Sequence, residues 1–211
     1  TIDIVKVASG ADNNFTYQWQ VSTNGSNWSN LSGSNLQYYS PGDLTNTRYY
    51  RVMATSTFGC GSIASDSVKV YVHPKIDAGS IGSFHNLCFG TKSDTLKFLT
   101  SQAPSGGGDS FSYQWQVAFD TIAFSNLSGA ANNYYQSDTL QATRYYRVVV
   151  TSLHGCSEDT SNHIKVNVYA DFDEGSIIGN DTICYDTRPD SLEVFTSPSG
   201  GGSTYNYQWL G

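Results

Sequence analysis

The chain has 211 residues, of which 38% are hydrophobic and 14% are charged, and its formal net charge is −7. This acidity argues against nucleic-acid binding, which depends on Lys and Arg contacts to phosphate. The chain has no apolar run of about eighteen residues, so we expect no membrane span in this segment.

A short aromatic stretch recurs along the chain. The sequence Tyr-Gln-Trp-Gln-Val occupies residues 17–21 and 113–117, and its first three residues return at 207–209. With a period of two, its Tyr, Trp and Val point to one face of a strand and its two Gln to the other. We therefore expect Trp19 and Trp115 to lie inside a two-sheet sandwich.

Other segments recur with a constant offset of 96 residues. The matching pairs are 47–52 with 143–148, 59–60 with 155–156, 68–70 with 164–166, 77–81 with 173–177, and Cys88 with Cys184. A constant offset over this distance predicts a repeated domain of about 95 residues.

The repeat predicts three domains, one complete and two partial. Residues 1–73 form an Ig-like repeat that lacks its N-terminal part, and residues 74–169 form a complete Ig-like repeat. Residues 170–211 form the N-terminal part of a third Ig-like repeat. We therefore expect the chain to be a window from a longer polypeptide, in which missing targeting signals carry no meaning.

The complete repeat shows strand signals at hairpin spacing. They cover residues 95–100, 111–118, 133–136, 144–151 and 163–169. With about seven short strands and no helical pattern, the predicted class is all-β, with tandem immunoglobulin-like antiparallel β-sandwich domains in a rod.

The polar residues of one strand indicate which of its faces is buried. Because Arg147 prefers water, the residues that alternate with it along the strand should face the core. The expected inward residues are Tyr146, Val148 and Val150, with Tyr50, Val52 and Ala54 as their counterparts in the first repeat.

Four cysteines, at 60, 88, 156 and 184, lack the Cys-x-x-Cys spacing of a zinc site. We favour a disulfide between Cys88 and Cys156, since each domain would then be self-contained in an oxidising compartment. The alternatives are pairing across the domain joints, Cys60 with Cys88 and Cys156 with Cys184, or free buried thiols.

No catalytic motif is apparent, so we expect no enzyme, no catalytic residue and no cofactor. The four His are isolated, and the glycine run 106–108 has no following Lys-Ser/Thr that would make it a phosphate loop. Asp171, Asp173 and Glu174 cluster at a domain joint, where extracellular repeats sometimes bind calcium. The matching first joint offers only Asp77, so we expect no metal site.

Some aromatic residues are candidate sugar contacts, since flat rings suit sugar faces. They are Trp28, Tyr39 and Tyr135. The alternative, which we favour, is that one Tyr of each adjacent pair is buried. Trp28 aligns with Phe124, which indicates a packing position.

The dipeptide Asp-Ser/Thr is unusually frequent: nine of the fifteen Asp are followed by Ser or Thr, and six of these nine then have an aliphatic residue. One interpretation is turn chemistry that leads into a strand. The other is an acceptor sequence for a sugar.

The series Tyr-Gln-Trp-Gln, Asn-Leu-Ser-Gly (30–33 and 126–129), Thr-Arg-Tyr-Tyr-Arg-Val and Gly-Cys resembles a known kind of repeat. It is similar to the tandem immunoglobulin-like (PKD-like) repeats of large Bacteroidetes cell-surface and gliding-motility adhesins exported by type IX secretion. Bacteria of that phylum O-glycosylate exported proteins at Asp-Ser/Thr-aliphatic sites. The sites that the resemblance implies are Ser67, Thr95, Thr121, Thr139, Thr182 and Ser191.

We accordingly expect a non-enzymatic, extracellular segment of a cell-surface adhesin or filament, acting as a disulfide-stabilised, O-glycosylated stalk. Its expected partners are neighbouring repeats of the same chain and an extracellular surface or polysaccharide, with no nucleic acid. The alternative is a carbohydrate-binding module array of a secreted enzyme.

Overall fold

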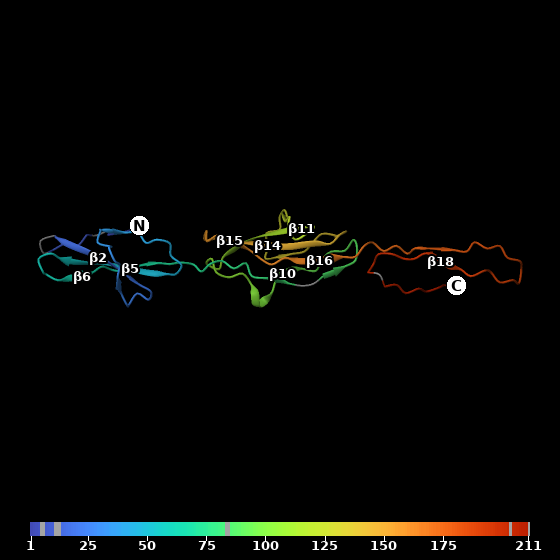
Figure 1. Ribbon diagram of the computed structural model, residues 1–211, viewed down its shortest axis with the longest axis horizontal. Coiled ribbons are helices and arrows are strands. Elements are labelled where there is room, and N and C mark those ends of the chain that lie inside the picture. The colour runs from blue at the N-terminus through green and yellow to red at the C-terminus, as the bar shows by residue number, and fades with distance from the viewer. Residues whose placement is uncertain (5–6, 11–13, 83–84, 203, 211) are drawn as a thin grey trace. The chain divides into compact units, whose positions relative to one another are not determined.

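A computed structural model describes residues 1–4, 7–10, 14–82, 85–202 and 204–210 of the chain (Figure 1). These residues form strands joined by turns and one short 3₁₀ helix, η1 (Thr100–Gln102). They divide into two compact units, residues 1–75 and residues 76–211. The predicted all-β class is confirmed.

The first unit has a large and a small sheet. The large sheet has the order β3-β2-β5-β6, with β7 also paired to β5, and the small sheet joins β1 to β4. The strands are β1 (Ile2–Asp3), β2 (Phe15–Ser22), β3 (Ser29–Asn30), β4 (Tyr38–Tyr39), β5 (Arg48–Ser56), β6 (Ser62–Ala64) and β7 (Val68–Val70).

The complete repeat, at the start of the second unit, adds strands to the same plan. Its sheets have the orders β13-β10-β8 and β12-β11-β14-β16-β9, with β15 also paired to β14. The strands are β8 (Ile81–Gly82), β9 (His85–Leu87), β10 (Leu96–Phe98), β11 (Phe111–Ala118), β12 (Ser125–Asn126), β13 (Tyr134–Tyr135), β14 (Arg144–Ser152), β15 (Glu158–Thr160) and β16 (Ile164–Val168).

The five strands expected in the complete repeat are confirmed as β10, β11, β13, β14 and β16. Four others, β8, β9, β12 and β15, are each two or three residues long and were not predicted. After Tyr169 the chain continues with β17 (Ser176–Ile178) and β18 (Glu193–Thr196), which pair antiparallel as β8 and β10 do.

The core of the complete repeat lies between its two sheets, which makes the repeat a β-sandwich. One cluster joins Ile81 and Leu96 of the small sheet to Trp115 and Val148 of the large one, and each of these four residues is at most 1% exposed. The neighbouring Tyr146 is buried as well, and this burial raises its pKa to about 12.

The predicted inward parity is confirmed in both repeats. On β5 and β14 every second residue is buried, and the buried set includes each residue expected to face the core. These residues are Tyr50, Val52, Ala54, Tyr146, Val148 and Val150. Trp19 and Trp115 are 3% and 0% exposed.

One strand pair departs from the antiparallel prediction. β9 pairs parallel with β16, so that His85 lies opposite Val166 and Leu87 opposite Val168. The amide of Tyr169 then donates to the carbonyl of Leu87 over 2.9 Å. An early strand of the repeat is thus bonded directly to its last strand.

Gly79 allows the N-terminal segment of the complete repeat to approach the loop after β10. Its φ is +70°, a left-handed conformation, and a Cβ at this position would collide with the carbonyl oxygen of Gln102. The amide of the next residue, Ser80, donates to that same carbonyl over 2.8 Å. Only glycine fits both constraints.

We predict that Gly79→Ala lowers the free energy of unfolding of the second unit by at least about 3 kcal/mol, because backbone strain and a backbone collision add together. Gly129→Ala is the matched control: its φ is +73°, but no atom lies within 4 Å of an added Cβ. The control should cost about 1 to 2 kcal/mol. Urea unfolding measures both, and equal losses would contradict the close approach.

Candidate functional site

The adjacent tyrosine pairs contribute one ring each to the core. The Tyr39 ring centroid lies 6.0 Å from that of Trp19 and 5.7 Å from that of Tyr50. Tyr135 repeats this arrangement, with 5.9 Å to Trp115 and 5.7 Å to Tyr146. The structure therefore gives the half-buried Tyr39 and Tyr135 a packing role against the core. Their contact with a sugar stays a prediction.

Trp28, the third candidate sugar contact, lies on the outer face of the large sheet of the first unit. The guanidinium carbon of Arg51 is 4.3 Å from its ring centroid. Arg51 Nε donates to Gln20 Oε1 over 2.8 Å, and Gln20 Nε2 donates to Asn30 Oδ1 over 2.8 Å. These contacts join strands β3, β2 and β5 and hold the guanidinium over the indole ring.

A second cation lies beside two tyrosines on the same face. The Lys69 ammonium is 5.7 Å from the ring centroid of Tyr49 and 5.1 Å from that of Tyr71. Tyr49 lies opposite Lys69 in the β5–β7 pairing, and Tyr71, 59% exposed, follows β7. We call Trp28, Tyr49, Arg51, Lys69 and Tyr71 the cation–aromatic face.

The complete repeat carries part of the same arrangement. Arg147 lies 4.1 Å from the centroid of Phe124 and donates from Nε to Gln116 Oε1 over 2.7 Å. His163 lies beside this stack, with its ring centroid 6.3 Å from that of Phe124 and 6.0 Å from that of Tyr145. The sequence showed that Trp28 and Phe124 align, but not that each stacks on an arginine, because the partners are 23 residues apart.

The six expected O-glycosylation residues are exposed, and each lies outside a strand. The clearest case is in the loop between β11 and β12. There Asp120 Oδ1 accepts amide bonds from Ala123 and Ile122, and these bonds lower the pKa of its carboxyl. The turn explains Asp120, but it does not explain Ile122, whose side chain is 85% exposed.

The expected Cys88–Cys156 disulfide is absent from the structure, where all four cysteines are free thiols. Cys60, Cys88 and Cys184 are exposed and Cys156 is half-buried, so the alternative of free, fully buried thiols is also wrong.

The strand register explains why Cys88 and Cys156 do not pair. Cys88 follows β9, which pairs with the part of β16 that lies opposite Arg144, the first residue of β14. Cys156 lies in the turn after Ser152, the last residue of β14. The length of β14, about 25 Å, separates these ends of the sheet, whereas a disulfide needs Cα atoms within about 7 Å.

Two carboxylates of the acidic cluster at the second joint accept hydrogen bonds from nearby backbone amides. Asp173 Oδ1 accepts from the Gly175 amide over 2.7 Å, and Asp171 Oδ1 accepts from the Phe172 amide over 3.0 Å. Within the described ranges, no group of three or more His, Cys, Asp or Glu is placed to hold a metal ion. None of the described helical segments is long and apolar enough to cross a membrane.

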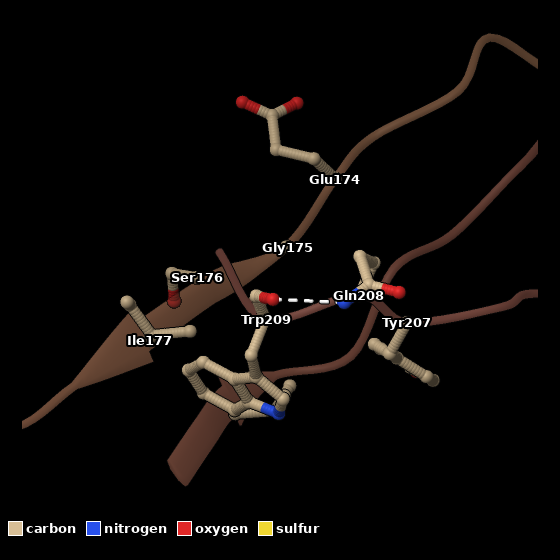
Figure 2. Close-up of a pocket in the computed structure, with 8 residues that line it drawn as sticks. Glu174, Gly175, Ser176, Ile177, Tyr207, Gln208 and Trp209 are labelled. Atoms are coloured by element: carbon tan, nitrogen blue, oxygen red, sulfur yellow. Dashed lines mark hydrogen bonds between the residues drawn. The ribbon is translucent and has the colours of Figure 1, made fainter. Parts of the chain in front are cut away.

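A hollow of about 400 Å³ lies in the segment after residue 170, lined in part by Ile177 and Trp209 (Figure 2). Gln208 Nε2 donates to the Trp209 carbonyl over 2.9 Å, as Gln114 does to that of Trp115. Ile177 and Trp209 are 61% and 55% exposed, whereas their counterparts in the complete repeat are buried. The hollow therefore lies at positions whose counterparts in the complete repeat form the core.

A family model described as "Domain of unknown function (DUF8696)" matches residues 2–74 and again residues 77–170. A comparison with curated proteins gives no match. Among solved structures, the chain is similar to the fibronectin(III)-like modules of Clostridium thermocellum CbhA, with 12% identity, a TM-score of 0.29, and coverage of 72% of this chain and 78% of that one.

Proposed function

This chain belongs to the family described as Domain of unknown function (DUF8696), and we propose that it is a non-enzymatic stalk segment of an extracellular cell-surface adhesin or filament. Two consecutive matches to one family support a tandem array. The resemblance to the repeats of surface adhesins exported by type IX secretion supports an extracellular location. A stalk must resist extension, and the strand topology of the complete repeat suits this role.

The observation that carries the proposal is the parallel pair of β9 and β16. Tension pulls the N-terminal side of the repeat and its C-terminal end in opposite directions. Because β9 and β16 run parallel, this tension loads the whole β9–β16 ladder at once, from His85–Val166 to Leu87–Val168. The bonds must be sheared together, which needs more force than opening them one after another.

We predict that Tyr169→Pro weakens the complete repeat under tension, because proline removes the backbone amide that donates to the Leu87 carbonyl over 2.9 Å at the end of the β9–β16 pair. In single-molecule pulling at constant force, its unfolding should accelerate at least about tenfold. Tyr169→Ala keeps the backbone amide and is the matched control, expected to unfold like the parent chain. If both variants unfold at the parent rate, the β9–β16 pair does not bear the load.

Glycosylation is the second part of the proposal. The six Ser and Thr residues of the Asp-Ser/Thr-aliphatic sites are all exposed and lie outside strands. The three Asp-Ser/Thr pairs without an aliphatic residue differ: Ser110 is half-buried, Thr160 lies in β15, and the Thr187 hydroxyl donates to the Cys184 carbonyl. Thr160 and Thr187 are exposed too, so it is the aliphatic third residue, and not exposure alone, that distinguishes the six sites.

We predict sugar mass on the peptide that carries Thr121 in protein purified from the cells that produce it. Ile122→Asp should abolish this modification without loss of stability, because the isoleucine side chain is 85% exposed and supports no packing. Peptide-mapping mass spectrometry measures both, with the Thr160 peptide as an internal control that should stay bare. An unmodified Thr121 peptide in the parent protein would contradict the glycosylation proposal.

A further inference from the structure

We propose that the cation–aromatic face of the first unit binds an acidic polysaccharide, a polymer of sugars that carry carboxylates. This inference is independent of the stalk function, because it concerns one outer sheet face and not the response of the fold to tension. It differs from the sugar contact expected from sequence, in which Tyr39 took part and cations did not.

The charges of this face oppose those of the whole chain. The chain carries −7, yet residues 14–42, 44–65 and 67–76 contain no Asp or Glu. Strands β2, β3, β5, β6 and β7 therefore bear no carboxylate, while Arg51 and Lys69 lie on the outer side of their sheet. A cationic face on an acidic molecule attracts an anionic partner, whereas the acidic remainder of the surface repels that partner.

Arg51 is held ready to bind a carboxylate. The position of the guanidinium over the Trp28 ring restricts the side chain, and its N–H groups all point outward within the guanidinium plane. Gln20 Oε1 accepts a hydrogen bond from the Nε–H group of Arg51. The two terminal nitrogens form the edge of the guanidinium that suits a bidentate carboxylate, and the ordering of the side chain is already provided by the stack.

Lys69 and its two tyrosines suit the sugar ring itself. The Lys69 ammonium lies between Tyr49 and Tyr71, and the exposed Tyr71 ring offers a flat apolar surface beside a charge. Sugars present apolar C–H faces that pack on aromatic rings. A carboxylated sugar on Tyr71 would thus find both its apolar face and its charge matched.

Nucleic acid is the competing anionic partner, and the observations favour the polysaccharide. Nucleic-acid binding relies on several phosphate contacts at once, whereas this face supplies two cations in a chain of net charge −7. The corresponding region of the complete repeat is a weaker candidate, since Glu158 and Asp159 on the neighbouring β15 bring negative charge to its sheet.

The test is binding of the whole chain to polygalacturonate oligosaccharides by isothermal titration calorimetry, with neutral dextran as the uncharged comparison. Lys69→Gln and Tyr71→Ala should each weaken the affinity about five- to tenfold, as expected for loss of a charge-assisted contact or a stacked ring. Both side chains are exposed, so neither change should unfold the protein. Lys97→Gln makes the same charge change on β10, on an exposed position of another sheet, and should bind like the parent.

The proposal is overturned if the parent chain does not bind, if dextran binds equally well, or if Lys97→Gln weakens binding as much as Lys69→Gln. Single-stranded DNA serves as a competitor. Displacement by DNA at an equal concentration of charges would show a general cationic patch and would also overturn the proposal. Selective loss in the Lys69 and Tyr71 variants, with no displacement by DNA, supports it.

Discussion

Each sandwich depends on the burial of its repeated tryptophan, whose indole nitrogen must find a hydrogen-bond acceptor inside the protein. Trp115 is fully buried, and its Nε1 donates to the Asn132 carbonyl over 2.9 Å. Trp19 makes the same bond to the Leu36 carbonyl at the same distance. An indole buried without this bond would lose much of what its burial contributes. The loop before β4 or β13 is therefore fixed by the tryptophan two strands away.

The glutamines beside the tryptophan fix the hairpin around it. Gln114 Nε2 donates to the carbonyls of Trp115 and Leu127, and Gln18 repeats this pattern with Trp19 and Leu31. The second glutamine of the motif turns outward and binds the arginine of the neighbouring strand. One strand thus organises the core with its tryptophan and the outer face with its glutamines, which accounts for the recurrence of Tyr-Gln-Trp-Gln as a unit.

The sequence could predict those parts of the fold that depend on interactions between residues close together along the chain. The alternation of Tyr50, Val52 and Ala54 is local and was sufficient to assign the buried face. The parallel β9–β16 pair joins segments about eighty residues apart through a strand of three residues, so no local pattern indicates it. The cysteine error has the same origin, since spacing along the chain does not reveal that Cys88 and Cys156 lie at opposite ends of β14. The Arg51–Trp28 stack was missed because it depends on strand register, whereas the exposure of Thr121 could be expected from its turn-forming neighbours.

Small-angle X-ray scattering of the chain tests the stalk account most directly. A compact globule of this length would have a radius of gyration of about 17 Å. Sandwich repeats joined end to end in a stalk should have a radius of gyration of at least about 25 Å. Their pair-distance distribution should have a tail at long distances. A value close to that of the compact globule would contradict the stalk, although the fold of each repeat would stand.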